Sequence, residues 1–131
     1  MSQENVDAFR RIGDAINRGD FEAAAAEIHP EMVFEPQRAA TEGAYVGHEG
    51  LRRWLADTAE TFELFRTDYP DVRDLGDRVL GIGSIRVRGR GSGVETDVPT
   101  AFVAEFRDGL CLRATDYREA RLAFAAAGLS E

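Results

Sequence analysis

The sequence has little of the chemistry that marks several common classes of protein. It contains one cysteine, Cys111, two histidines and no lysine among 131 residues. A single cysteine cannot form an internal disulfide, so a soluble cytoplasmic protein is the default expectation. No apolar run approaches the roughly 20 residues needed to span a bilayer, and the polar segment Met1–Asp7 is unlike a signal peptide.

Metal-binding and nucleotide-binding motifs are also missing. The segment His48-Glu-Gly-Leu-Arg52 lacks the second histidine of a zinc-binding helix, and His29 has no partner at a ligand spacing. Gly81-Ile-Gly-Ser-Ile-Arg86 lacks the third glycine of a dinucleotide-binding loop, and glycine inside a strand more often marks a bend or bulge. We therefore expect no metal and no cofactor. Cys111, in an apolar strand, is expected to be a buried and inert thiol.

The charge of the chain is acidic, with 24 acidic residues, 16 basic residues and a net charge of -8. This balance argues against binding to nucleic acid or to anionic lipid. The alternating arginines of Arg86–Arg90 would suit a basic face, but a turn centred near residues 91 and 92 pairs Arg88 with Glu95 and Arg86 with Asp97. We therefore predict cross-strand ion pairs on a solvated face, and neither nucleic acid nor membrane as a partner.

Helical spacing appears in three segments before residue 66. Apolar residues three and four positions apart predict a first helix from Asn5 that ends at Arg18-Gly19. Asp20 is placed to cap a second helix, which ends before Pro30. A third helix is predicted from Leu51 to Phe65.

Period-two patterns and turn signals predict the strands. The candidates, separated mostly by glycine-containing turns, are Met32–Glu35, Tyr69–Leu75, Arg78–Arg90, Val94–Phe106 and Leu110–Glu119, followed by a terminal helix over Ala120–Ala127. This order predicts an α+β fold, in which three N-terminal helices meet a curved antiparallel sheet in a single domain over residues 1–131. Gln37–Gly47 is predicted to be a long polar loop.

Two carboxylates are the leading candidates for chemistry. Glu35 ends the first strand directly before Pro36, and Asp116 shares one face of the last strand with Leu112 and Ala114. An acid on an apolar face is either paired with a cation or has a raised pKa, and both conditions suit proton transfer. The alternatives are that Asp116 pairs with Arg118 and that Glu35 points to solvent.

Four segments together resemble the nuclear-transport-factor-2-like superfamily, in its SnoaL-like polyketide cyclase and ketosteroid isomerase branches. They are Asp14-Ala-Ile-Asn-Arg-Gly-Asp20, His29-Pro-Glu-Met-Val-Phe-Glu-Pro36, Tyr45-Val-Gly-His-Glu-Gly-Leu51, and Asp108-Gly109 with Arg113-Ala-Thr-Asp-Tyr117. The resemblance implies a cone, cystatin-like in shape, in which a bent sheet and three helices enclose a pocket. Its members include isomerases, cyclases, epoxide hydrolases, dehydratases and proteins with no known reaction.

The resemblance also implies roles for single residues. Glu35 before Pro36 resembles the Asp-Pro of ketosteroid isomerase, whose two oxyanion donors correspond to Ile12 and Phe102 here. Asp116 resembles the acid/base of SnoaL-like cyclases, and with Arg118 it is similar to one end of the catalytic set of the related epoxide hydrolases.

These lines combine into one hypothesis and one alternative. The hypothesis is a small pocket protein that binds an apolar oxygenated metabolite, and that acts as a cofactor-independent isomerase, cyclase, lyase or hydrolase through Asp116 and Glu35. The alternative is a non-catalytic ligand-binding or dimeric assembly module, and in both cases we expect a homodimer through the open sheet face. The predicted ligand-binding residues are Phe34, Tyr45, Trp54, Phe62, Phe102, Phe106 and Arg118.

Overall fold

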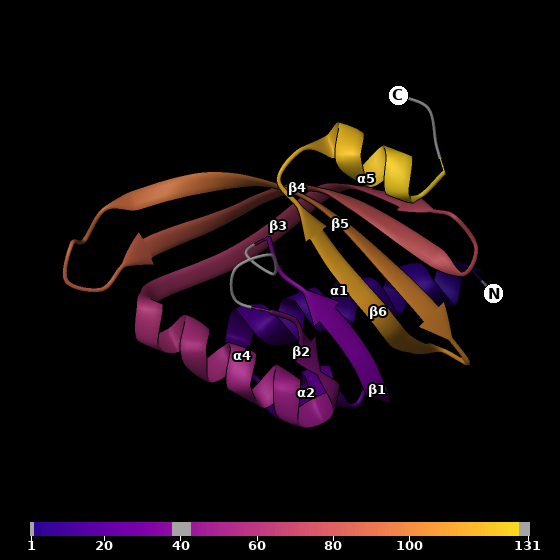
Figure 1. Ribbon diagram of the computed structural model, residues 1–131, viewed down its shortest axis with the longest axis horizontal. Helices are drawn as coiled ribbons and strands as arrows, with labels where there is room; N and C mark the ends of the chain where they lie inside the picture. Colours follow the sequence, from indigo (N-terminus) through magenta and orange to yellow (C-terminus); the bar gives the residue numbers. More distant parts are fainter. Residues whose placement is uncertain (1, 38–42, 129–131) are drawn as a thin grey trace.

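A curved six-stranded sheet with helices packed mainly on its concave side forms the fold (Figure 1). The computed structural model describes residues 2–37 and 43–128. The elements in chain order are α1 (Ser2–Arg18), α2 (Phe21–Ala25), β1 (Ile28–Glu35), β2 (Tyr45–Val46), α4 (Gly47–Thr61), β3 (Phe62–Asp74), β4 (Arg78–Gly89), β5 (Glu95–Arg107), β6 (Leu110–Tyr117) and α5 (Ala120–Ala126). The predicted α+β fold class is confirmed.

The first two helices follow the local signals in the sequence. Helix α1 ends where Gly19 adopts a φ of 67°, a left-handed conformation that costs glycine little. The Asp20 carboxylate then accepts a hydrogen bond from the Ala23 N–H at 3.1 Å and caps α2. The predicted break between the two helices is therefore confirmed.

The sheet has the strand order β2-β1-β6-β5-β4-β3, and one pair departs from the prediction. Strands β3 to β6 form the expected antiparallel meander, but β1 and β6 run parallel, so the sheet is mixed. Parallel neighbours need a long crossover connection. Here that connection contains α4 and the four strands β2 to β5, and the curvature of the sheet brings the last strand, β6, beside β1.

Two boundaries also differ from the prediction. Helix α4 ends at Thr61, and Phe62 and Phe65 belong to β3, which pairs with β4 from Phe62 to Asp74. The spacing of these two phenylalanines fits a helix as well as a strand, and the long pairing with β4 decides in favour of the strand. Strand β1 begins at Ile28 rather than Met32. The predicted loop contains the short strand β2, and its residues 38–42 lie outside the described residues.

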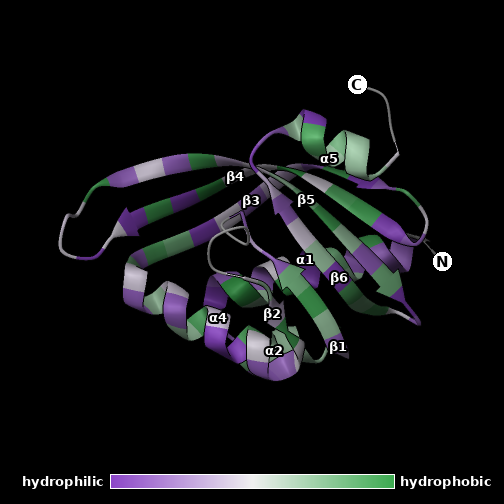
Figure 2. Cartoon of the chain, viewed as in Figure 1, coloured by the Kyte–Doolittle hydropathy of each residue, from purple (hydrophilic) through white to green (hydrophobic). Residues whose placement is uncertain are grey.

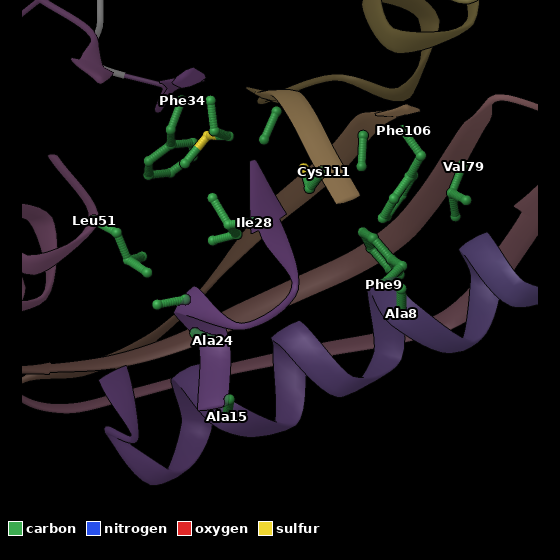
Figure 3. Close-up of a cluster of buried hydrophobic side chains, with 14 of the residues drawn as sticks. Ala8, Phe9, Ala15, Ala24, Ile28, Phe34, Leu51, Val79, Phe106 and Cys111 are labelled. Atoms are coloured by element: carbon green, nitrogen blue, oxygen red, sulfur yellow. The ribbon is translucent and has the colours of Figure 1, made fainter. Parts of the chain in front are cut away.

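The hydrophobic residues form one cluster on each side of the sheet. The larger cluster fills the space between the concave face and α1, α2 and α4, and Figure 3 shows Phe9, Ile28, Phe34 and Leu51 facing this interior. A smaller cluster around Leu80 lies under α5 on the other face. Figure 2 shows hydrophobic and hydrophilic bands alternating along helices and strands, as expected for elements with one buried side.

The hairpin of β4 and β5 carries the predicted ion pairs. Arg88 lies opposite Glu95 and Arg86 opposite Asp97. The N–O distances are 2.6 Å for Arg88–Glu95 and 3.0 Å for Arg86–Asp97, and Arg86 also reaches Glu95 at 2.6 Å. The prediction of a matched, exposed charge ladder is confirmed. Within residues 2–37 and 43–128, no helix is long and apolar enough to cross a membrane.

Candidate functional site

An apolar cavity lies inside the larger hydrophobic cluster. The space open to the centre of a water-sized sphere is about 80 Å³, several times the roughly 10 to 15 Å³ that one water needs by this measure. Helices α1 and α4, strand β1 and the concave face of the sheet enclose it. The lining residues are Phe9, Ile12, Gly13, Ile16, Ile28, Met32, Phe34, Leu51, Trp54, Phe65, Thr67, Tyr69, Ile85, Phe102, Ala104, Cys111, Ala114 and Asp116.

Asp116 is the one carboxylate among the described residues that line the cavity. It stands on β6, opposite Phe102 of β5 and two residues after Ala114, so strand alternation directs all three toward the cavity. The Thr100 hydroxyl donates a hydrogen bond to Asp116 Oδ1, and Gln37 Nε2 lies 3.4 Å from the same oxygen. Gln37 is held in turn by the Pro99 carbonyl at 3.1 Å.

The surroundings of Asp116 favour its protonated form. Burial raises its pKa to about 6, because an apolar site disfavours the charged form, while the hydrogen bonds from Thr100 and Gln37 act in the opposite direction. In the described part of the chain, Asp116 makes no ion pair with Arg118, whose side chain is exposed. The alternative of a simple Asp116–Arg118 pair is therefore wrong.

Tyr69 and Thr100 were not predicted as site residues from the sequence. Tyr69 lines the cavity from β3, and its ring packs beside those of Phe9 and Phe102. Thr100 is buried, with 3% of its surface exposed, and its hydroxyl donates to Asp116. The nearby Thr67 is already engaged, since Asn17 Oδ1 accepts hydrogen bonds from its backbone N–H at 2.8 Å and from its hydroxyl at 3.2 Å.

Glu35 does not face the cavity, which corrects the expectation of two inward carboxylates. Its Oε1 accepts hydrogen bonds from Arg113 Nη2 at 2.8 Å and from the Thr115 hydroxyl at 3.3 Å. Phe34 lines the cavity, and strand alternation sends the next side chain to the opposite face. Arg113 and Thr115 stand on that same outer face of β6, so Glu35 binds its neighbours across the parallel pair.

The other predicted ligand-binding residues divide into two groups. Phe34, Trp54 and Phe102 line the cavity, with the Phe34 and Trp54 rings in an edge-on arrangement at 5.2 Å. Their role in binding remains a prediction. Phe62 and Phe106 do not line it: Phe62 packs on Phe65 with ring centres 6.1 Å apart, and Phe106 is buried elsewhere in the core.

Two polar candidates also lie away from the cavity. Tyr45 is buried, and its hydroxyl donates to Asp57 Oδ2 at 2.9 Å, so it braces β2 against α4. Arg118 is exposed beyond the end of β6. Neither side chain contacts the cavity in the described structure.

Cys111 lines the cavity as a buried thiol, as predicted. Burial raises its pKa to about 12, and a backbone hydrogen bond of Arg113 opposes that effect only in part. The thiol therefore stays protonated at neutral pH and is a poor nucleophile. Across residues 2–37 and 43–128, no three His, Cys, Asp or Glu side chains converge on a metal-binding position.

Comparison with known families gives a match over most of the chain. The sequence model of the SnoaL-like domain matches residues 9–114. No curated protein matches the sequence significantly.

Several solved structures share the fold. The protein TerC, crystallised with polyporic acid, has a TM-score of 0.79 and 21% identity, over 95% of this chain and 97% of that one. An NTF2-like protein from Burkholderia pseudomallei has a TM-score of 0.80 and 17% identity, over 93% and 95% of the two chains. A protein with a ketosteroid isomerase-like fold from Catenulispora acidiphila, in complex with trimethylamine, has a TM-score of 0.76 and 18% identity, over 94% and 93%.

Proposed function

The chain belongs to the SnoaL-like family, and from that premise we propose that its cavity binds a small, apolar, oxygenated metabolite on which Asp116 acts as general acid and base. The observation that carries the proposal is a single carboxylate, with a pKa of about 6, in the wall of an otherwise apolar cavity. Glu35 has no part in this proposal, because it lies on the opposite face of the sheet.

A carboxyl group with this pKa is suited to move protons in both directions near neutral pH. Both its acidic and its basic form are populated there, and a positioned acid/base group contributes about 10²- to 10⁴-fold to a rate. The Asp116 carboxylate removes a proton from the carbon next to a carbonyl, and the electron pair of that C–H bond moves toward the carbonyl oxygen. The carboxylic acid then returns the proton to a different atom, so that the step is an isomerisation or one half of a cyclisation.

The shape and polarity of the cavity support this class of ligand. The aromatic side chains of Phe34, Trp54 and Phe102 offer flat surfaces to a ring or an alkyl chain, while the polar groups gather around Asp116. Two proteins of similar fold were crystallised with small organic molecules, polyporic acid and trimethylamine. Hydrophobic pockets with few convergent polar groups are typical of small-molecule sites.

A two-stage experiment tests the proposal. A thermal-shift screen with small ketones, enones and polyketide-like compounds first finds ligands, since a ligand that binds the native state raises the melting temperature. Proton NMR in deuterated buffer then follows exchange at the carbon next to the carbonyl of each ligand. We expect exchange with the wild-type chain, its loss in Asp116→Asn, and its retention in the matched control Glu35→Gln. Equal exchange with Asp116→Asn and wild type would refute the role of Asp116.

A second proposal, that the chain is a homodimer, rests on the outer face of the sheet. Helix α5 covers only part of that face, and Ile82, Val103 and Tyr117 beside it are half-buried rather than buried. Farther along, the face carries the alternating arginine and acidic side chains of the β4–β5 hairpin, an arrangement able to pair with a second copy of itself. Light scattering at micromolar concentration should give twice the monomer mass, and a monomer would refute the proposal.

A further inference from the structure

Tyr69 continues the alternation by which Phe65 and Thr67 face the cavity, and it lies at a β-bulge between β3 and β4. The pairs Asp68–Ser84 and Asp71–Ile82 flank the bulge, so that Tyr69 and Pro70 together oppose Gly83. Proline has no N–H for a ladder hydrogen bond and is tolerated here because β3 is an edge strand. Bulges often re-aim a side chain next to a functional site.

Glycines opposite the bulge make this placement possible. A Cβ atom on Gly83 would lie 1.9 Å from the Asp68 carbonyl oxygen, and one on Gly81 would lie 2.6 Å from the ring of Phe9 and 3.1 Å from that of Tyr69. Any larger residue at either position would displace the backbone or the rings. The Tyr69 ring is then held between Phe9 and Phe102, with ring centres 5.2 and 6.2 Å away.

Gly83 also leaves the space between Tyr69 and Thr100 free of a side chain. Tyr69, Gly83 and Thr100 form a row across β3, β4 and β5. Two strand spacings, about 9.5 Å, separate the outer members of the row. Because the middle member has no side chain, none stands between the Tyr69 ring and Thr100, whose hydroxyl donates to Asp116.

We infer that Tyr69 is a second catalytic residue, which donates its O–H hydrogen to the carbonyl oxygen of the substrate while Asp116 takes a proton from the neighbouring carbon. The inference rests on the proposed function and narrows its substrate class to enolisable ketones and related carbonyl compounds. The positions that resemble the oxyanion donors of ketosteroid isomerase hold Ile12 and Phe102, both of which line the same cavity without a donor group. Tyr69 supplies the missing donor from another strand.

The protonation of Tyr69 fits a donor rather than a base. Burial first, and then the nearby charge of Asp116, raise its pKa above the ordinary value, so that the phenol keeps its proton. An oxygen that gains negative charge becomes a stronger acceptor, so a hydrogen bond from Tyr69 to the substrate oxygen strengthens as the reaction proceeds.

The charges of the site balance through the step. The C–H bond breaks, and its proton neutralises Asp116. Its electron pair forms the C=C bond, and the former C=O π electrons move to the oxygen beside Tyr69. The site carries one negative charge before and after, and the charge has moved from Asp116 to the substrate oxygen.

Binding of 2-naphthol provides the test, because its ionised form is a flat apolar molecule with one anionic oxygen and therefore resembles the enolate. The background is Asp116→Asn, which stands for the neutral Asp116 of the intermediate. The double variant Asp116→Asn/Tyr69→Phe removes the donor. The matched control is Asp116→Asn/Tyr117→Phe, which removes a phenol hydroxyl from the opposite face of the sheet. Fluorescence separates the ionised from the neutral form of the bound probe, and thermal melting confirms that each variant is folded.

We expect the Tyr69→Phe change to weaken binding of the ionised probe by about 10- to 100-fold, to lower the ratio of ionised to neutral bound probe by a similar factor, and to leave the Tyr117→Phe control unchanged. An unchanged ratio after Tyr69→Phe would overturn the inference alone, provided that the chain with Asp116 still catalyses exchange at the carbon next to a carbonyl. A wild-type chain that shows no exchange and binds no carbonyl compound would overturn the proposed function and this inference together.

Discussion

The raised pKa of Asp116 predicts that its ionised carboxylate lowers the free energy of unfolding of the chain at neutral pH. A carboxyl group whose folded pKa exceeds its unfolded value binds protons more tightly in the native state. The native state is therefore favoured while the group is protonated, and stability falls as the pH rises between the two values. From an ordinary pKa of about 3.9 to about 6 in the folded chain, the full cost is about 3 kcal/mol above pH 7.

Asp116→Asn removes this cost without a change of shape. The free energy of unfolding should exceed that of the wild type by about 0.5 kcal/mol at pH 4 and by about 3 kcal/mol at pH 8, beside a pH-independent offset for the change of hydrogen bonds. Urea denaturation at pH 4, 5, 6, 7 and 8 measures the difference. Asn keeps an oxygen that accepts from Thr100, so the offset should be small.

The control for this experiment is Glu35→Gln, which removes an acid from the outer face of the neighbouring strand β1 and reports the effect of losing one charge from an acidic chain. A gain in stability from Asp116→Asn that stays constant from pH 4 to pH 8 would contradict a raised pKa for Asp116. A gain that decreases toward pH 8 would show that the carboxylate is stabilised in the cavity, which is the opposite of the expected sign.

Three further predictions concern the walls of the cavity. Gly83→Ala should destabilise the fold by about 2 kcal/mol or more, measured by urea denaturation, because its Cβ would meet the Asp68 carbonyl. Gly13→Ala, whose Cβ would meet only the Thr67 hydroxyl at 3.9 Å, is the control for loss of a glycine, and equal effects would contradict the close approach at Gly83. Cys111 should resist alkylation at pH 8 in the native chain and react fully in urea, and rapid native labelling would contradict its burial. Trp54 fluorescence should change when a ligand enters the cavity, and ligands that leave it unaltered bind elsewhere.

The parts of the fold that could be predicted are those set by local physical rules. Helix α1 follows from apolar spacing and from Gly19, and the β4–β5 hairpin follows from its turn and the facing charges of Arg88 and Glu95. The start of β3 could not be placed, because Phe62 and Phe65 suit both a helix and a strand until β4 pairs with them. The parallel β1–β6 pair is equally non-local.

The candidate site shows the same division. Asp116 could be found from the alternation of side chains along β6. The same rule should have excluded Glu35 from the cavity, because Phe34, the residue before it in β1, faces the cavity and neighbouring side chains of a strand point to opposite faces. Tyr69 could not be assigned, because its place in the cavity depends on the pairing of β3 with β4 and on two glycines in β4. The two glycines indicate a bend or bulge in the sequence, but the sequence does not show which side chain packs against them.

The interior position of β6 has a consequence for how the site comes into being. The strand that carries Asp116 is the last of the sheet in sequence, yet it lies between β1 and β5. The cavity wall therefore stays incomplete until nearly the whole chain has folded, and pairings so distant in sequence form late and slowly. Binding of a cavity ligand would then require the completely folded chain. A chain that ends before residue 110 would lack β6 and leave the apolar interior open on that side, so it would have no such site.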